Sequence, residues 1–237
     1  MLTHCFAFLE GISPAKEKKL HDTGIRTWDD FLKSERIKGI SATKKAYYDR
    51  QLLLAQDALV HKNPNYFAEL LPQREMWRLY PHFRDVCFLD IEADSRGIIV
   101  LTLFDKYESK TFVRGVHLEK DTVHQELGKY QLIVTFNGSS YDLPKLKKFG
   151  VEIHVPHIDL KALCQRLKLI GGLKEIEIQL GIHRPQHLRG SATDAWRAFW
   201  ASGDREYLEL LVDYNEQDAV SLYQLMEKCM KMVAGKL

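Results

Sequence analysis

The stretch Phe88-Leu89-Asp90-Ile91-Glu92 decides the fold that we expect for this chain. It is a short apolar run interrupted by two carboxylates at alternate positions. Successive side chains of a β-strand point to opposite faces, so Asp90 and Glu92 share one face while Leu89 and Ile91 face a core. The Cα atoms of the two acids would lie roughly 6.6 Å apart, a separation that their side chains can close over one metal site. Buried acids are costly unless a cation neutralises them, so the stretch predicts further acidic ligands elsewhere.

The composition is that of a globular protein of one or two domains in 237 residues. Hydrophobic residues make up 45% of the chain, which is enough for a substantial core, and a formal net charge of +2 decides nothing about nucleic acid. The four cysteines contain no C-x-x-C pair, which favours a reducing compartment over a disulfide framework. The sequence shows no signal peptide and no apolar run near the ~20 residues of a membrane span. We therefore expect a cytoplasmic protein that does not bind membranes.

A repeated Gly-Ile-Ser sequence, at residues 11–13 and 39–41, marks the first 60 residues. Each copy predicts a turn that enters a helix, with Ser13 or Ser41 as the N-cap, and Thr27 can cap a further helix between them. The sequence therefore predicts a small all-α helical module.

The residues between this module and the acidic stretch are rich in both proline and large apolar side chains. A flexible linker would be less apolar, so we expect a partly helical connector that packs along the second domain. The predicted domains are the helical module at 1–60, the connector at 61–82 and a larger domain at 83–237.

The larger domain has the pattern of an α/β fold. Three strand-like runs with short connections predict antiparallel pairing, and strands and helices alternate after them. This order is that of an RNase H-like mixed β-sheet with helices on both faces. The expected strands are 84–92, 97–104, 110–117, 131–136 and 151–155, and the expected helices are 118–129, 143–149, the stretch from about 159, 173–180, 192–200 and 204–230.

Two further acids occupy positions where an acid is locally unfavourable. Asp142 follows the strand at 131–136, at the edge of an α/β sheet where ligands collect. Asp218 lies in the apolar stripe of the last helix, in line with core leucines, and Tyr214 precedes it by four residues on the same helix face.

These residues resemble the motifs of the DEDD superfamily of 3′–5′ exonucleases. Asp90-Ile91-Glu92 resembles the first motif, the segment from Asn137 to Asp142 the second, and the segment from Tyr214 to Asp218 the third. The tyrosine four residues before the last acid indicates the tyrosine (DEDDy) subclass. The whole chain resembles predicted RNase H-like exonucleases that carry an N-terminal helix-hairpin-helix-like module.

The resemblance implies a metal-dependent phosphodiester hydrolase. Asp90, Glu92, Asp142 and Asp218 would hold two Mg²⁺ or Mn²⁺ ions, and oxygen ligands suit these ions better than zinc. Tyr214 would orient the attacking water. The implied substrate is a single-stranded or frayed 3′ end, with DNA favoured over RNA.

Three residues near the second motif are candidates for substrate contacts. Asn137 belongs to the motif itself, Tyr141 could stack a terminal base, and Lys145 could meet a phosphate. For Tyr141 and Lys145 the alternatives are a core aromatic residue and a solvated helix face.

One departure from the family pattern follows the first motif. The residue after Glu92 is often threonine in that family and here is Ala93, followed by Asp94, which adds negative charge near the site. His154, His157 and Asp159 form another metal-like group, but we expect Asp159 to be a helix N-cap.

Two other functions stay open on the sequence. One is a non-catalytic nucleic-acid-binding or scaffold protein that keeps the fold, and the other is an RNase H-like endonuclease. The four acids argue against the first, because a site for the polyanionic backbone has no use for buried negative charge without metal. The sequence leaves the oligomeric state unknown.

Overall fold

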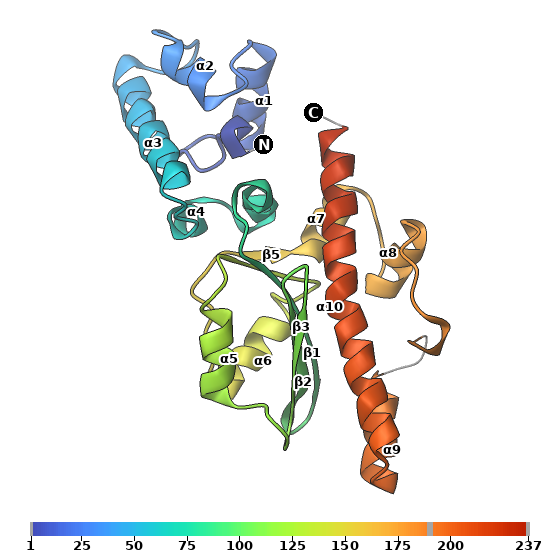
Figure 1. The fold of residues 1–237 in the computed structure, drawn as a ribbon. Coiled ribbons are helices and arrows are strands. Elements are labelled where there is room, and N and C mark those ends of the chain that lie inside the picture. Colours follow the sequence, from blue (N-terminus) through green and yellow to red (C-terminus); the bar gives the residue numbers. More distant parts are fainter. Residues whose placement is uncertain (1, 189–191, 236–237) are drawn as a thin grey trace. The chain divides into compact units, whose positions relative to one another are not determined.

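The computed structural model describes residues 2–188 and 192–235, and its contacts divide the chain into two compact units. The first unit is Met1–Arg84 and the second is Asp85–Leu237. Figure 1 shows the helices of the first unit and the mixed α/β structure of the second. None of the helices in the described residues is long and apolar enough to cross a membrane.

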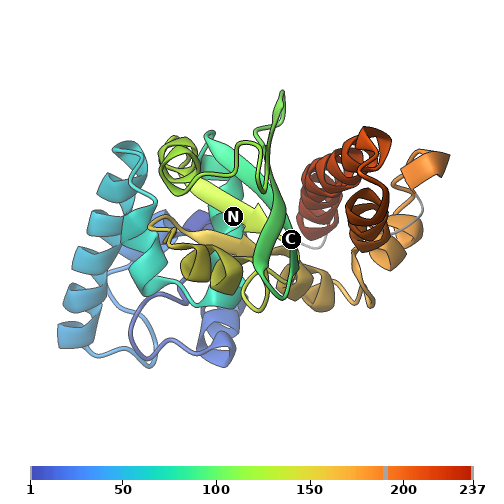
Figure 2. The same cartoon turned by 90° about the horizontal axis from the view of Figure 1, so that it is seen from below.

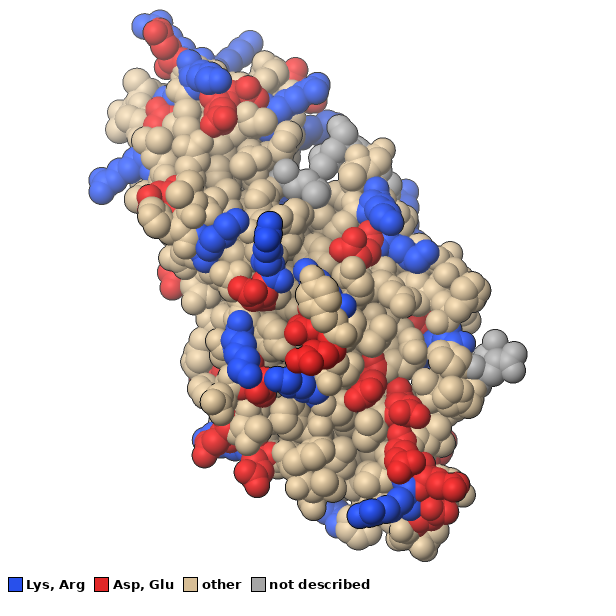
Figure 3. Space-filling view, in the orientation of Figure 1, with Lys and Arg blue, Asp and Glu red and all other residues tan. Residues whose placement is uncertain are grey.

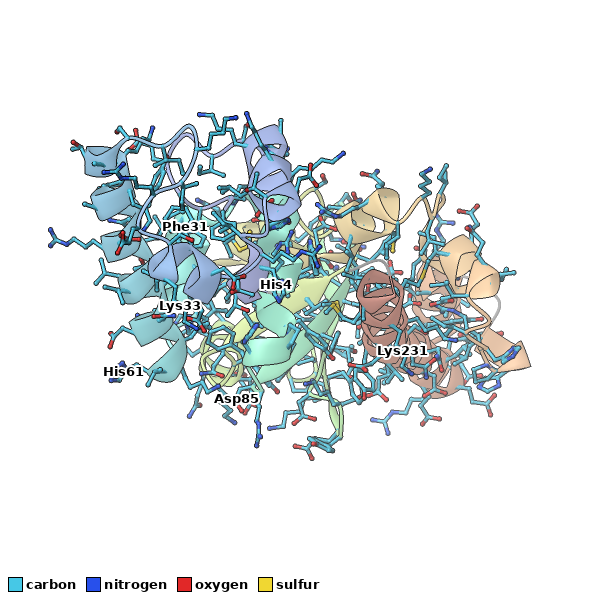
Figure 4. The ribbon with its side chains drawn as sticks, turned by 90° about the horizontal axis from the view of Figure 1, so that it is seen from above. His4, Phe31, Lys33, His61, Asp85 and Lys231 are labelled. Carbon is cyan, nitrogen blue, oxygen red and sulfur yellow. The ribbon has the colours of Figure 1, made fainter. Side chains whose placement is uncertain are left out.

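The first unit is helical. Its aromatic core includes Phe31, labelled in Figure 4, whose ring centroid lies 5.6 Å from that of Phe6 and 6.1 Å from that of Tyr48. In chain order the elements are η1 (Leu2–His4), α1 (Pro14–Asp22), α2 (Trp28–Lys33), α3 (Ala42–Val60), α4 (Asn65–Leu70) and η2 (Gln73–His82).

The sequence repeat of the first unit is also a repeat of structure. Gly11 and Gly39 both have positive φ, at 76° and 85°, and each lies in a turn closed by the N–H of the following isoleucine. A positive φ at this position of a turn suits glycine, which has no Cβ. The next residue in each copy, Ser13 or Ser41, then caps α1 or α3 by accepting the backbone N–H three residues on. The predicted N-caps are therefore confirmed.

Residues 61–82, which we expected to be a connector along the second domain, contain all of α4 and η2 and belong to the first unit. The ring of Phe67 stacks on Trp28 with centroids 6.3 Å apart, and the Tyr66 hydroxyl donates a hydrogen bond to the backbone oxygen of Gln51. The apolar side chains of this segment therefore serve the core of the helical unit.

The second unit contains a five-stranded mixed sheet in the order β3-β2-β1-β4-β5. β2 pairs antiparallel with β1 and β3, while β4 is parallel to β1 and β5. The predicted RNase H-like arrangement is confirmed. The strands are β1 (Val86–Asp94), β2 (Gly97–Phe104), β3 (Ser109–Val113), β4 (Leu132–Thr135) and β5 (His157–Asp159), and the helices are α5 (Lys120–Leu127), α6 (Asp142–Phe149), α7 (Leu160–Arg166), α8 (Leu173–Gln179), η3 (Gln186–Leu188), α9 (Ala192–Ser202) and α10 (Arg205–Ala234).

Helices cover both faces of this sheet. α5 and α6 pack on one face, and α10 with α9 packs on the other, as Figure 2 shows with the sheet seen between them. Leu89 and Ile91 point into the core under α5 and α6, whereas Phe88 packs against Tyr223 of α10. The expected alternation along β1 is therefore confirmed.

The expected strand at 151–155 is wrong. Gly150 ends α6 with a φ of 93°, and the N–H of Val151 then folds back onto the carbonyl of Leu146. The apolar residues that suggested a strand therefore follow this turn back toward α6 and do not form a strand. Pairing with β4 begins only after Pro156, which has no N–H to give to a ladder, so β5 is the short segment His157–Asp159.

Candidate active site

Asp90 lies in the middle of the sheet, on the face of β1 that α10 covers. Its cross-strand neighbour is Thr102, and the Asn215 side chain on α10 donates a hydrogen bond of 2.6 Å to Asp90 Oδ2. Asn215 is fully buried, so this bond forms without competition from water. The carboxylate of Asp90 is therefore held in one orientation by the helix that covers it.

Glu92 lies two residues further along the same face, where the pairing of β1 with β2 changes. The register shifts between Glu92 and Ala93, so Glu92 is opposite Val100 and Ala93 is opposite Ile98. A shift of this kind bends the strand and re-aims side chains at the end of a ladder. Glu92 is thus placed at an irregularity of the β1–β2 ladder, beside the other acids.

Asp94 does not carry a free negative charge next to the site. Arg114, the residue after β3, donates two hydrogen bonds to the carboxylate of Asp94, from Nη2 to Oδ1 at 2.9 Å and from Nη1 to Oδ2 at 3.1 Å. The hydrogen bonds from Arg114 lower the pKa of Asp94 to about 2. The departure Ala93-Asp94 therefore fixes the β1–β2 hairpin through an ion pair.

Asp142 is the first residue of α6 and follows a tight turn whose conformation depends on particular residues. Asn137 adopts a φ of 63°, and a Cβ at Gly138 would lie 1.9 Å from Thr135 Oγ1, so only glycine fits there. Asp159 holds this turn by accepting the N–H groups of Asn137 and Ser139. Asp142 is only 3% exposed, and the backbone N–H of Ile91 on β1 partly offsets the rise in its pKa that burial causes.

Asp159 also caps α7, since its carboxylate accepts the N–H of Lys161. The predicted N-cap is confirmed. His157 is buried and shares a 2.8 Å hydrogen bond between its Nε2 and Thr135 Oγ1, while His154 is exposed. Asp159 and His157 therefore support the turn that positions Asp142.

Asp218 comes from α10, where leucines on its own stripe, Leu211, Leu222 and Leu225, are fully buried. The stripe carries the aspartate into the protein, as its spacing predicts. Tyr214, one turn earlier, is also buried, and its hydroxyl donates a 3.0 Å hydrogen bond to the backbone oxygen of His187. The water-orienting role of Tyr214 stays a prediction.

The four carboxylates lie close enough to repel one another. Burial raises the pKa of Asp90 well above its usual value, and the charges of Asp218, Asp142 and Glu92 add to the rise. Burial likewise raises the pKa of Asp142 to about 7 and that of Glu92 above its usual value. Acids from β1, the start of α6 and α10 therefore form one electrostatic cluster, which favours proton or cation binding.

Three residues of this neighbourhood have no counterpart in the sequence analysis. Arg184, in the loop after α8, forms an ion pair with Asp218 and hydrogen bonds of 2.5 and 2.7 Å to the two oxygens of Glu177. Lys174 of α8 interacts electrostatically with Glu92 and Asp218. Loop residues such as Arg184 follow no periodic pattern, so their sequence carries no signal, whereas the buried position of Asn215 could have been read from the stripe of α10.

The three predicted substrate contacts are on the turn and first helical turn around Asp142. Tyr141 is 36% exposed, and burial and the charge of Glu92 raise the pKa of its hydroxyl. Lys145 Nζ lies 5.5 Å from the centre of the Tyr141 ring. The Asn137 side-chain oxygen accepts a hydrogen bond from Lys161 Nζ at 3.2 Å. The structure thus brings Tyr141 and Lys145 beside the acids and ties Asn137 to α7.

A comparison of the sequence with models of protein families finds a match to the RNase H superfamily over residues 87–230, most of the second unit. The chain belongs to the RNase H superfamily. Membership indicates a nuclease that hydrolyses nucleic acid, and the sheet order agrees with it. A search of curated proteins found no match to the chain.

RNase H-like nucleases usually use divalent metal ions, so the site can be tested against such an ion. Its donors are carboxylate oxygens, which suit Mg²⁺ and Mn²⁺, and Asp142 Oδ1 is buried without a hydrogen-bond partner among the described residues. The described residues contain no group of three or more His, Cys, Asp or Glu side chains placed to hold a metal. The carboxylate oxygens are therefore suitable ligands for Mg²⁺ or Mn²⁺. The carboxylates would have to move closer together to bind an ion.

Proposed function

We propose that this RNase H superfamily member is a metal-dependent 3′–5′ exonuclease that acts on single-stranded or frayed ends, with DNA preferred over RNA. One observation carries the proposal: Asp90, Glu92, Asp142 and Asp218 come from three separate segments and form one cluster of mutually repelling acids, in which Asp142 is buried and the other three are partly buried. A protein that only binds the nucleic-acid backbone gains nothing from such a cluster, because phosphate and carboxylate repel.

In this proposal the four acids hold two Mg²⁺ or Mn²⁺ ions. The chemistry that two such ions supply is activation of water and stabilisation of the leaving oxygen. Asn215 orients Asp90, the turn closed by Asp159 orients Asp142, and the rigid stripe of α10 carries Asp218. The protein thus contributes oriented carboxylate donors that would draw together around a cation.

Tyr214 orients the attacking water in the proposed reaction. Its place one turn before Asp218 and the resemblance to the DEDDy motif support this role. Its hydroxyl donates a hydrogen bond to the backbone oxygen of His187 in η3. The proposed role therefore requires this hydrogen bond to break when substrate binds.

The distribution of charge supports a path for the substrate strand. On the face shown in Figure 3, acidic side chains gather over the first turns of α10, where Asp204, Glu206, Glu209 and Asp213 are exposed. A polyanion avoids that surface. Lys145 and Tyr141 on α6 and its turn provide the opposite features, a cation and an exposed ring next to the acids, so we place the path by which the single strand approaches the acids there.

We propose that the first unit is a helix-hairpin-helix-like module that contacts nucleic acid. Its two equivalent turns present Lys16 and Lys44 near Gly11, at the start of capped helices. The hairpin of such modules has the pattern Gly-Ile-Gly, and in both copies here a serine, Ser13 or Ser41, stands in place of the second glycine. The proposed location is the cytoplasm, in keeping with four cysteines that are buried and free of disulfides.

The proposed activity is tested with end-labelled single-stranded DNA and Mn²⁺. The expected result is stepwise shortening from the 3′ end that is lost in Asp90→Ala. Cleavage of a circular single strand would instead indicate an endonuclease. Binding without any cleavage, with the same affinity in Asp90→Ala, would indicate a non-catalytic protein.

A further inference from the structure

A pocket of about 500 Å³ opens in the second unit beside the acidic cluster. It is formed by α8 and the loop that follows, and its volume falls within the roughly 300–1,000 Å³ of small-molecule sites. Its walls combine apolar and basic side chains: Ile178, Ile182, Lys174, His183 and Arg184, with Glu177 and Gly181.

Arg184 connects this pocket to the acidic cluster. Its side chain is 8% exposed, and its guanidinium joins Glu177, which lines the pocket, to Asp218, which belongs to the cluster. Both oxygens of Glu177 are engaged by Arg184, so the carboxylate holds the guanidinium in a fixed plane. The arginine is thus positioned for a ligand that reaches both the pocket and the acids.

The remaining nitrogen of Arg184 indicates what that ligand carries. Nη1 is buried and has no hydrogen-bond partner in the described part of the chain. A buried donor without an acceptor costs free energy, and a guanidinium matches the oxygens of phosphate. A phosphate oxygen that reaches Nη1 exchanges its own hydration for a charge-assisted hydrogen bond, and Nη1 itself, being buried, has no contact with solvent to lose.

Lys174 adds a second positive charge on the same side. It lines the pocket, interacts electrostatically with Glu92 and Asp218, and has its Nζ 6.0 Å from the centre of the Tyr214 ring. A phosphate next to Arg184 therefore lies within reach of Lys174, while the exposed Ile178 and the buried Ile182 offer apolar surface to a sugar or base.

We propose that this pocket binds the phosphate-bearing terminal nucleotide of the substrate, with Arg184 as the buried phosphate ligand. The inference rests on the proposed nuclease function and adds to it a substrate residue outside the four acids. Glu177 is a positioning residue in this account, because it acts through Arg184.

The test is calorimetric binding of a deoxynucleoside 5′-monophosphate to the full chain in Ca²⁺. Inorganic phosphate and the deoxynucleoside without phosphate are the comparison ligands, and Ca²⁺ binding is measured separately without nucleotide. Arg184→Gln is expected to weaken nucleotide binding about tenfold or more, as for a lost charge-assisted hydrogen bond. It is expected to leave Ca²⁺ binding unchanged or tighter, because Asp218 is released from its ion pair.

Two further variants keep the test falsifiable if Arg184→Gln folds poorly. Lys174→Gln removes an exposed charge of the pocket and is expected to weaken nucleotide binding about threefold. Lys231→Gln is the matched control, since Lys231 (Figure 4) is exposed on the same helix as Asp218 and about 20 Å further along it. It is expected to change nothing.

Several outcomes would overturn the inference. Arg184→Gln and Lys174→Gln could bind the nucleotide like the wild type, or the nucleoside could bind as tightly as the nucleotide. Equal binding of inorganic phosphate and nucleotide would remove the nucleotide from the proposal. A chain that binds no Ca²⁺ but loses nucleotide affinity in Arg184→Gln would contradict the metal-dependent function and leave the pocket assignment standing.

Discussion

The two faces of β1 have opposite roles in the protein. On one face Leu89 and Ile91 are fully or almost fully buried in an apolar core under α5 and α6. On the other face Asp90 and Glu92 are partly buried under α10, where the loss of solvent and the neighbouring acids raise their pKa. The first face stabilises the fold, and the second costs stability in order to hold charge.

This difference supports a functional role for the acidic face. Alternating leucine and isoleucine would have packed both faces at little cost, and replacing buried charges by apolar residues often leaves a protein as stable or more stable. The protein instead makes additional contacts with the acids, such as the hydrogen bond from Asn215 to Asp90. The two faces should therefore respond to mutation in opposite ways.

The largest effect is expected for the acidic face in catalysis. Asp90→Asn keeps the size of the side chain and removes its charge, so the proposed exonuclease rate should fall by about 10³-fold or more, because the metal ions would lose a ligand. The thermal midpoint of the metal-free protein should stay the same or rise, because a buried repulsion is relieved. Single-turnover kinetics and calorimetry check the two results. A lower midpoint with near-normal activity would reverse the roles of the faces.

The apolar face should show the converse. Leu89→Ala leaves a cavity in the core under α5 and α6 and is expected to lower the free energy of unfolding by about 2–5 kcal/mol. The rate per folded molecule should change little, since Leu89 points away from the acids. Urea unfolding measures the first quantity, and activity normalised to the folded fraction measures the second. A selective loss of rate in a fully stable variant would contradict this separation.

A smaller effect is expected in the pH dependence of metal-free stability. The folded protein holds a proton on Asp142 up to about pH 7, whereas the unfolded chain releases it near the usual value of 3.8. More protons are then bound in the folded state, so this group's contribution to stability is lost as pH rises from about 4 to 7, by at most about 1.4 kcal/mol per unit. Asp142→Asn should flatten the slope in EDTA; an unchanged slope would show that Asp142 is not responsible.

The smallest effect is expected at the departure from the family pattern. Asp94 is paired with Arg114 at the hairpin, so Asp94→Asn should change the exonuclease rate by no more than about twofold. A large gain in rate or in Mn²⁺ affinity in this variant would show that the charge of Asp94 acts on the site. Steady-state kinetics at several Mn²⁺ concentrations make the measurement.

Local patterns were sufficient to predict most of the fold. The alternation in Phe88–Glu92 predicted which residues of β1 are in the core, and the stripe of α10 predicted that Asp218 is carried inward. The error at 151–155 arose because apolar residues after a helix can return to that helix instead of joining a sheet. Sequence periodicity alone does not distinguish these uses.

The acids of the candidate site were visible in the sequence because each breaks a local pattern, whereas their partners were not. Arg184 lies in a loop, and its link to Asp218 depends on how α8 and α10 pack. The bond of the Tyr214 hydroxyl to His187 likewise depends on the position of η3. Long-range contacts of this kind follow from the tertiary structure, so they carry no signature in the spacing of residues.

The central claim is that carboxylates from three segments form one metal site, and direct Mn²⁺ binding tests it. Electron paramagnetic resonance of the full chain titrated with Mn²⁺ should show two bound ions in the wild type. Asp90→Asn and Asp142→Asn should each lose at least one of them, while Asp94→Asn keeps both. Equal Mn²⁺ binding in the wild type, Asp90→Asn and Asp142→Asn would contradict the account.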